Sequence, residues 1–273
     1  MIRRAEKSAV LRVSGMFSMI GFWFTTKGGF MIYRFETISS TNDEASRLAR
    51  EGAEAFTVVV ADSQQAGRGR NGHSWVSPAG VGLYASVVLR PRVATEFLPT
   101  VTLLAGIAAA EAVMGCSGLP VMIKWPNDLL IYNRKVAGLL CEAELFSSGD
   151  SVVIAGLGVN VNTSETALPA RTRFPATSLL IESGHHTDRD ALLEAWVARL
   201  RDWMAIFETQ GVEQILAAWR QRDALTDRKI HVLLPDRATI RGVGAGVAGD
   251  GSLLVKLDDG SVRSVIAGEV SLG

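Results

Sequence analysis

The sequence of 273 residues predicts a domain of mixed helices and strands, followed by a small all-β domain. Before residue 225, short runs of β-branched apolar residues alternate with segments whose apolar residues recur at helical spacing. After it, the chain changes to short strand-like runs separated by turn sequences such as Gly249-Asp250-Gly251. This spacing is typical of a small barrel. We therefore expect one domain over residues 31–224 and an appended domain over residues 225–273.

Charge and cysteine content exclude several classes of protein. The 28 basic residues balance 28 acidic ones, whereas a dedicated nucleic-acid-binding domain is usually strongly basic. Cys116 and Cys141 are the only cysteines, which is too few for a disulfide framework, and no Cys/His pattern has metal-ligand spacing. We expect buried thiols in a cytoplasmic protein, no metal held by protein ligands, and neither nucleic acid nor a membrane as partner.

The first thirty residues superficially resemble a signal peptide. Arg3 and Arg4 precede an apolar run over residues 16–24. That run is too short to span a bilayer, and no small-residue cleavage site follows it. We interpret residues 1–30 as a poorly ordered upstream extension, with Met31 as a candidate for the true start.

The first helix of the main domain begins near residue 41. Thr41 and Glu44 have the spacing of a capping box, in which each side chain bonds a free main-chain N–H of the first turn. Spacing alone therefore assigns Ser40, Thr41 and Asn42 to helix capping. A ligand contact is compatible with capping, because a helix N-terminus presents free donors to whatever lies before it.

Periodicity and turn residues predict the remaining elements. Residues 163–188 are expected to form a loop, and Asn133-Arg134-Lys135 a hairpin turn. An aromatic stripe that includes Trp196 is expected to be core. The predicted strands lie at residues 32–36, 56–61, 82–89, 121–124, 128–132, 136–145, 152–162, 229–234, 239–243, 253–257 and 263–266, and the further helices at residues 98–114, 188–208 and 212–222.

A loop rich in glycine and arginine follows the strand at residues 56–61. Its centre reads Gly67-Arg68-Gly69-Arg70-Asn71-Gly72. Glycine lets the main chain approach a ligand closely, and guanidinium groups supply charge and forked donors for phosphate or carboxylate. The same residues are also typical of a solvated turn or of a nucleic-acid contact. The loop is thus a candidate anion site that needs a second signal.

Further motifs downstream supply that signal. Lys124-Trp125-Pro126-Asn127-Asp128 follows one short apolar strand, and Arg134-Lys135-Val136-Ala137-Gly138 follows another. Gly156 and Gly158 lie inside a later strand, where glycine indicates close approach of a ligand or a neighbouring backbone. Together with the glycine-arginine loop, these motifs point to one small-molecule site.

In this order and spacing, the four motifs closely resemble those of the biotin protein ligase family, from about residue 33 to the C-terminus. The resemblance implies an α+β catalytic domain with a mixed β-sheet, similar to class II aminoacyl-tRNA synthetases and biotin–lipoyl ligases, and a C-terminal SH3-like barrel. It also implies synthesis of biotinyl-5′-AMP from biotin and ATP, with Mg²⁺ accompanying ATP. Biotin then passes to a lysine of a biotin carboxyl carrier protein. The oligomeric state is left open, with a homodimer as one alternative.

The resemblance assigns catalytic roles to Lys135 and Arg70. Lys135 resembles the lysine that bridges carboxylate and α-phosphate, although the residues alone favour a solvated hairpin lysine there. Arg68 and Arg70 would neutralise the biotin carboxylate and the phosphates, and Ser40, Thr41, Asn42 and Gln64 would hold the ureido ring. The full set of implied binding residues is Ser40, Thr41, Asn42, Gln64, Gly67, Arg68, Gly69, Arg70, Trp75, Asn127, Asp128, Lys135, Gly138 and Asn160.

Two other functions compete with this one. A lipoate or octanoate ligase shares the fold and also adenylates a small acid, but its usual signature is an arginine pair leading into a glycine triplet. A nucleic-acid-binding module would use the arginine loop and the barrel, which the neutral net charge disfavours. Bifunctional family members also carry an N-terminal helix-turn-helix domain. Too few residues precede Tyr33 for that domain, so we expect no DNA binding.

Overall fold

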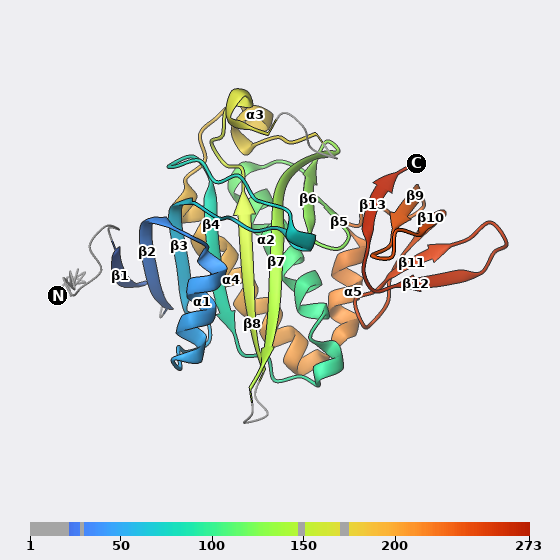
Figure 1. Ribbon diagram of the computed structural model, residues 1–273, viewed down its shortest axis with the longest axis horizontal. Helices are drawn as coiled ribbons and strands as arrows, with labels where there is room; N and C mark the ends of the chain where they lie inside the picture. Colours follow the sequence, from blue (N-terminus) through green and yellow to red (C-terminus); the bar gives the residue numbers. More distant parts are fainter. Residues whose placement is uncertain (1–21, 28–29, 147–150, 170–174) are drawn as a thin grey trace, which may run out of the picture.

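A mixed eight-stranded sheet is the centre of the computed structural model, which describes residues 22–27, 30–146, 151–169 and 175–273. The strand order is β1-β2-β3-β4-β8-β7-β6-β5, and only β2 and β3 pair in parallel (Figure 1). The predicted α+β class is therefore confirmed. The strands are β1 (Phe22–Lys27), β2 (Phe30–Ile38), β3 (Val58–Gln64), β4 (Leu83–Leu89), β5 (Met122–Lys124), β6 (Asp128–Ile131), β7 (Arg134–Leu145) and β8 (Ser151–Val159).

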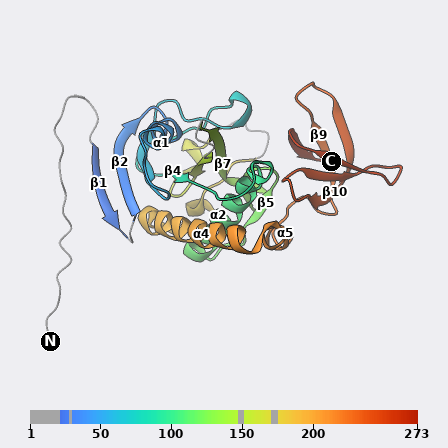
Figure 2. The ribbon, with the colours of Figure 1, turned by 90° about the horizontal axis from the view of Figure 1, so that it is seen from below.

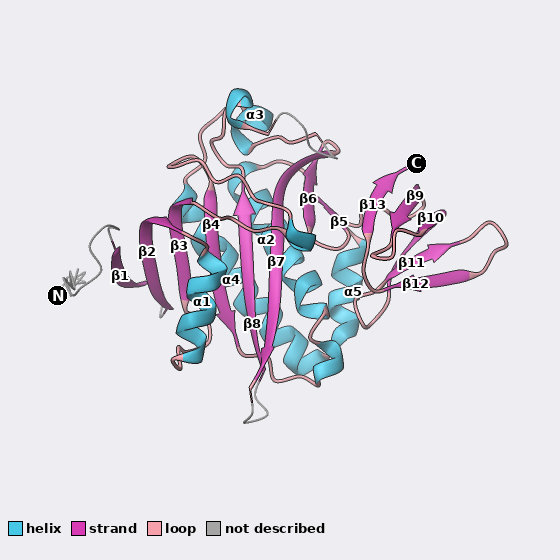
Figure 3. Cartoon of the chain, in the orientation of Figure 1, coloured by secondary structure: helices cyan, strands magenta, loops and turns pink. Residues whose placement is uncertain are grey.

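Helices cover both faces of this sheet. Helix α1 packs on one face against β3, β4 and β8, and α2 packs on the other against β7 and against α4 and α5 (Figures 2 and 3). The predicted aromatic stripe is core, since Trp196 is fully buried on α4. The helices are α1 (Thr41–Arg50), α2 (Thr100–Ser117), α3 (Leu179–Ser183), α4 (Arg189–Gln210) and α5 (Val212–Arg220).

Helix α2 is apolar on all sides. Its 18 residues have the length and composition of a membrane span, but 67% of them are buried inside the protein. A helix that packs between a sheet and two other helices needs apolar residues all round. It ends at Gly118, whose φ of 70° is the left-handed conformation that glycine adopts without strain. The composition of α2 therefore follows from its central position.

The C-terminal part forms a second, five-stranded antiparallel sheet in the order β12-β11-β10-β9-β13. Its all-β character is confirmed, and its likeness to an SH3 barrel stays a prediction. A turn of this sheet contacts the main domain: Trp125 Nε1 donates to the carbonyl of Gly251 at 2.9 Å, and Thr100 Oγ1 to that of Gly249 at 3.0 Å. The strands are β9 (Lys229–Leu233), β10 (Thr239–Val247), β11 (Leu253–Lys256), β12 (Val262–Val265) and β13 (Glu269–Leu272).

The N-terminal region differs from the expectation of a poorly ordered extension over residues 1–30. Residues 22–27 form β1, which pairs antiparallel with β2 from Phe22 opposite Phe35 to Lys27 opposite Phe30. Both runs are rich in aromatic and β-branched residues, and two glycines separate them in the sequence, which is a hairpin signal. Residues 1–21 and 28–29 lie outside the described residues, so the rest of the expectation stays untested.

The expected capping box is wrong. Ser40 is the N-cap residue, and the Thr41 hydroxyl donates to Gln64 Oε1 instead of bonding the first turn. The Glu44 carboxylate accepts from Arg47. Contacts with the neighbouring strand β3 therefore outweigh local capping, and the start of α1 faces the sheet.

Three other boundaries differ from the predictions. The β6–β7 turn consists of Tyr132 and Asn133, which have φ of 48° and 60°, so Lys135 lies on strand β7 and not in the turn. The expected loop over residues 163–188 contains α3, whose first turn is capped by Ser178. Strand β13 was not predicted, because its four residues carry no periodic signal long enough to detect.

Candidate active site

A cavity of about 510 Å³ lies over β7 and β8, between the start of α1 and the C-terminal sheet. This is within the usual range for small-molecule sites. Of the predicted binding residues, all but Gly67 line it. These lining residues are Ser40, Thr41, Asn42, Gln64, Arg68, Gly69, Arg70, Trp75, Asn127, Asp128, Lys135, Gly138 and Asn160.

One end of the cavity is a network of neutral polar groups. The Thr41 main-chain N–H donates to Gln64 Oε1 at 2.9 Å, and Gln64 Nε2 donates to Ser77 Oγ at 3.0 Å. The hydroxyl of Ser86, fully buried on β4, lies 2.6 Å from Asn42 Oδ1 and 2.8 Å from Thr41 Oγ1. Buried groups satisfied in this way hold fixed orientations. This polar end can recognise a neutral ring that carries both donors and acceptors.

Glycines on β7 and β8 make room for the side chains above them. A Cβ on Gly158 would stand 2.5 Å from the Trp75 indole, and one on Gly138 would stand 3.1 Å from it. Gly138 and Gly158 are opposite each other in the β7–β8 register. A Cβ on Gly156 would stand 2.1 Å from Asn42 Oδ1. The glycines suggested by the sequence therefore serve close approach of neighbouring side chains.

The other end of the cavity is cationic. Asp128 is buried and accepts from Lys124 Nζ at 2.9 Å and from Lys135 Nζ at 2.5 Å. Burial alone would raise the pKa of Asp128, but the two lysines hold it below its ordinary value. Burial lowers the pKa of the Arg70 guanidinium, and Asp128 opposes this shift. Because an arginine stays charged in proteins, three cations here face one carboxylate.

Main-chain contacts fix Lys135 in place. Its N–H donates to the carbonyl of Pro175 at 2.7 Å, and its carbonyl accepts from the N–H of Thr177 at 2.9 Å. Its Nζ also lies 5.4 Å from the centre of the Trp75 ring, close enough for a cation–π contact. Trp75 Nε1 is buried and has no hydrogen-bond partner among the described residues. The ammonium group is therefore held at one defined point of the cavity.

The two asparagines predicted near the nucleotide bond the main chain. Asn127 Nδ2 donates to the carbonyl of Leu139 at 2.5 Å, and Asn160 Nδ2 to that of Thr177 at 2.9 Å. The Asn127 amide joins the turn between β5 and β6 to strand β7, and the Asn160 amide joins the end of β8 to the segment before α3. Their predicted contacts with a nucleotide remain predictions, since the observed bonds are structural.

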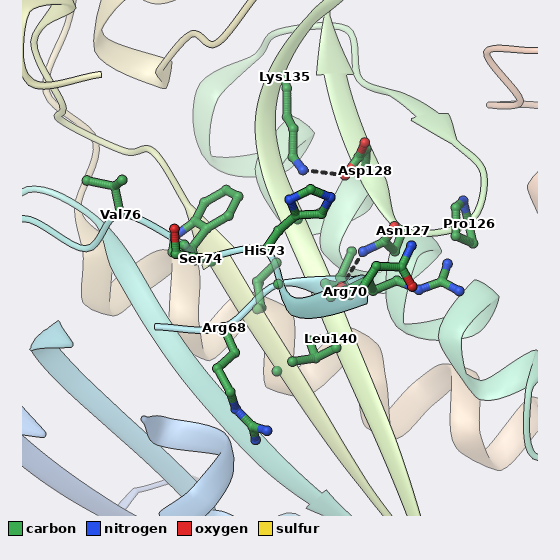
Figure 4. A pocket seen from close by; sticks show the side chains of 18 of the residues that line it. Arg68, Arg70, His73, Ser74, Val76, Pro126, Asn127, Asp128, Lys135 and Leu140 are labelled. Carbon is green, nitrogen blue, oxygen red and sulfur yellow. Dashed lines mark hydrogen bonds and ion pairs between the residues drawn. The ribbon is translucent and has the colours of Figure 1, made fainter. Parts of the chain in front are cut away.

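The two arginines of the glycine-arginine loop point in different directions (Figure 4). Arg70 lies near Asn127 in the cavity, whereas Arg68 turns toward Asp43 and Glu142. Its guanidinium is 2.6 Å from the Asp43 carboxylate and 3.0 Å from that of Glu142. Two carboxylates thus neutralise Arg68, a placement that does not favour its predicted role as a phosphate ligand.

The loop folds as a short hairpin with a tight tip. The N–H of Gly69 donates to the carbonyl of His73 at 2.7 Å, and the N–H of Trp75 to that of Gly67 at 2.8 Å. Asn71 takes a φ of 55° at the tip. From the C-terminal sheet, Glu269 reaches this hairpin through His73 Nε2 at 3.1 Å. The second domain therefore completes the rim of the cavity.

Sequence reasoning missed several residues of this site. Lys124 is the first residue of the motif that ends at Asp128, but the sequence predicted no role for it. Ser86 and Glu142 lie within predicted strands, and a polar residue in an apolar run such as that of Ser86 is the signal that was available. Gly268 and Glu269 carry no such signal, since they come from a domain with no motif of its own.

Comparisons with known proteins agree on one family. Residues 34–160 match the sequence model of the biotin/lipoate A/B protein ligase family, and residues 227–273 match that of the biotin protein ligase C-terminal domain. Among curated relatives, the biotin–[acetyl-CoA-carboxylase] ligase of Paracoccus denitrificans is 34% identical over 86% of this chain and 97% of its own length.

Two further similarities extend over most of the chain. The bifunctional ligase/repressor BirA of Bacillus spizizenii is 34% identical over 90% of this chain and 75% of its own length. The structure of biotin protein ligase from Aquifex aeolicus in complex with biotin and ATP has a TM-score of 0.74 and 29% identity, and the match covers 89% of this chain and 98% of that one. This chain belongs to the biotin protein ligase family.

Proposed function

We propose that this protein is an ATP-dependent biotin protein ligase. In the first half-reaction, a carboxylate oxygen of biotin attacks the α-phosphorus of ATP, and the bond to the bridging oxygen breaks. Pyrophosphate leaves, and biotinyl-5′-AMP remains. In the second half-reaction, a lysine amine of the acceptor attacks the acyl carbon and AMP leaves. The relatives named as biotin ligases and the structural neighbour with biotin and ATP support this activity.

The two unlike ends of the cavity carry the proposal. The polar end, around Thr41, Asn42 and Gln64, offers satisfied neutral groups that suit a ureido ring. The cationic end, around Lys135, suits the carboxylate and the phosphates. A molecule with a neutral ring at one end and an anionic group at the other spans the two, as biotin does.

Lys135 has the placement needed to stabilise the first transition state. Negative charge gathers on the α-phosphate as the carboxylate attacks, and a fixed ammonium nearby stabilises it more than it stabilises the separate substrates. Asp128 orients the ammonium before the substrates bind. Arg70 adds a second charge from the loop, so that closing the loop also neutralises the intermediate.

Magnesium enters this scheme as part of the substrate MgATP. Among the described residues, no three His, Cys, Asp or Glu side chains come together as a metal site. Both oxygens of Asp128 are already bonded to lysines. Phosphate and water oxygens, which Mg²⁺ prefers in nucleotide sites, would therefore supply its coordination.

A biotin-dependent carboxylase supplies the acceptor, as the name of the Paracoccus relative states for that enzyme. We propose more narrowly that the acceptor lysine lies on a biotin carboxyl carrier domain. We also propose that nucleic acids are not partners, since 28 basic residues are balanced by 28 acidic ones. A steep salt dependence of binding to duplex DNA would contradict the latter point.

Pyrophosphate release from MgATP tests the function directly. The purified chain is assayed with biotin, lipoate and octanoate as the acid, each at the same concentration. We expect release with biotin alone. Release only with lipoate or octanoate would keep the adenylation chemistry and overturn the substrate, and no release with any acid would overturn the enzyme itself.

A further inference from the structure

Glu142 stands just outside the cavity and touches two residues that line it. It lies on β7 on the same side as Gly138 and Leu140, which are cavity residues four and two positions earlier. Its Oε2 accepts from Asn42 Nδ2 at 2.7 Å and from an Arg68 guanidinium nitrogen at 3.0 Å. One carboxylate thus joins the polar end of the cavity to the glycine-arginine loop.

The first consequence concerns the direction of the Asn42 amide. Its two N–H groups are both used, one by Glu142 and the other by the carbonyl of Leu140 at 3.1 Å. A carboxylate only accepts, so it forces Nδ2 toward itself and leaves Oδ1 facing Ser86 at 2.6 Å. The charge on Glu142 therefore sets which way the hydrogen bonds run at the polar end.

The second consequence concerns the loop. The Arg68 side chain is 44% exposed, and pairs this exposed contribute little to folding. The contact with Glu142 therefore holds the loop against β7 without contributing much to the stability of the fold. Its loss should change ligand affinity much more than it changes the stability of the fold.

We propose that Glu142 is a positioning residue for the biotin end of the site. It orients Asn42 and holds the loop closed through Arg68, so that biotin binding and loop closure depend on the same carboxylate. This inference rests on the proposed function for its ligand. The arrangement of the loop itself can be tested without any substrate.

The chain provides a matched control two residues further along the same strand. Glu144 projects from the same face of β7 and also bonds α1, through Ser46 and Arg50. It reaches neither Asn42 nor the loop in any contact that the described residues make. Glu142→Gln and Glu144→Gln therefore each remove one negative charge from β7 next to α1. Only Glu142→Gln changes a residue that contacts the site.

We expect Glu142→Gln to raise the KM for biotin in pyrophosphate release about tenfold, the effect of losing one charged hydrogen bond. The KM for ATP should change less than twofold, and Glu144→Gln should leave both values within twofold of the wild type. Both donors reach the same oxygen, so a glutamine can still accept from them, but without the negative charge that strengthens both hydrogen bonds. Equal KM values for biotin in the two variants would overturn the proposal.

Limited trypsin digestion of the ligand-free protein gives a second readout that needs no activity. Trypsin cleaves after Arg68 and Arg70 in the loop, and after Arg237 in an exposed turn of the C-terminal sheet. We expect Glu142→Gln to speed loop cleavage about tenfold relative to cleavage at Arg237, and Glu144→Gln to leave the ratio unchanged. An unchanged ratio in Glu142→Gln overturns the inference even where the ligase activity of the wild type is established. Equal acceleration at all three sites also overturns it, because it indicates general unfolding.

Discussion

The two ends of the cavity use opposite strategies to fix their side chains. At the polar end, Thr41 bonds Gln64, and the buried Ser86 bonds both Thr41 and Asn42, while the Glu142 carboxylate outside the cavity accepts from Asn42. At the cationic end, Lys124 and Lys135 are held by the charge of Asp128. The properties of the polar end depend on the direction of each donor and acceptor. Those of the cationic end depend on the sum of its charges.

This difference explains how one cavity serves recognition and chemistry together. Neutral hydrogen bonds are directional, so they discriminate between rings with different donors and acceptors. Fixed charges act over a longer range and stabilise an anionic transition state without moving. A change at the polar end should therefore alter the KM for biotin, whereas a change at the cationic end should alter the rate of adenylation.

The largest expected effect is at the cationic end. Lys135→Ala should lower the rate of adenylate formation about 10³-fold, the size seen when a fixed transition-state charge is removed. The KM for biotin should change little, because the polar end is untouched. Single-turnover pyrophosphate release measures this rate.

Arg134→Ala is the control for Lys135, since it removes a neighbouring cation of the same hairpin that pairs with Glu182 outside the cavity. It should lower stability and leave the adenylation rate within threefold. A near-normal rate in Lys135→Ala, or an equal loss in both variants, would show that the ammonium is not the stabilising charge.

Asp128→Asn should destabilise the fold by about 3 kcal/mol at neutral pH, because it removes the buried carboxylate that the buried Lys124 and the partly exposed Lys135 share. The pKa of Asp128 lies below its ordinary value of 3.8 in the folded state. Its contribution to stability is therefore complete above that value, and is lost as the pH falls through the lower, native pKa. Urea unfolding at several pH values should show the gap between wild type and variant shrinking below about pH 4.

The exposed pair of Asp202 with Arg199 provides the comparison for this pH dependence. Asp202→Asn should change the free energy of unfolding by less than about 0.5 kcal/mol. A gap between wild type and Asp128→Asn that stays constant down to pH 3 would mean that the carboxylate is not ionised between its lysines.

Strands β7 and β8 form the floor of the cavity beneath both ends, and a substitution there should have a smaller effect than one at the cationic end. Gly158→Ala places a Cβ 2.5 Å from the Trp75 indole, which must move away, and overpacking of this kind costs about 1–3 kcal/mol. We expect a KM for biotin raised about tenfold and a lower melting temperature. In helix α2, Gly115→Ala meets no heavy atom within 4 Å and should stabilise the fold slightly. If both variants bind biotin normally, the glycine on β8 is not needed for the indole.

The sequence was sufficient for most elements with a clear period. The buried helix α2, strands β2 to β8 of the main sheet and the all-β C-terminal part were predicted, because burial on one or both faces leaves a regular pattern. The start of α1 at Thr41 was predicted, but its capping was not, because Thr41 bonds Gln64 on strand β3 and not its own first turn. Strand β13 is too short for periodicity to show.

The site was predictable only where motifs mark it. The glycine-arginine loop and the motif around Asp128 directed attention to the cavity, but Lys135 owed its role to the family resemblance alone. Asn42 and Glu142 are 100 positions apart in the sequence, and no local rule connects them. The direction of Arg68 is likewise decided by carboxylates from α1 and β7, which only the folded chain brings together.

The smallest expected effect is that of replacing Arg70, the arginine of the loop that lies at the cationic end. Arg70→Gly removes the half-buried guanidinium at the cationic end, yet Lys124 and Lys135 remain, so the adenylate should still form. Its dissociation should become about tenfold faster, because one charged contact to the bound intermediate is lost. Release of labelled biotinyl-5′-AMP from the purified complex measures this rate. If dissociation is unchanged while adenylate formation collapses, Arg70 belongs with Lys135 as a charge needed for the chemistry, and the loop contributes to catalysis as much as to retention.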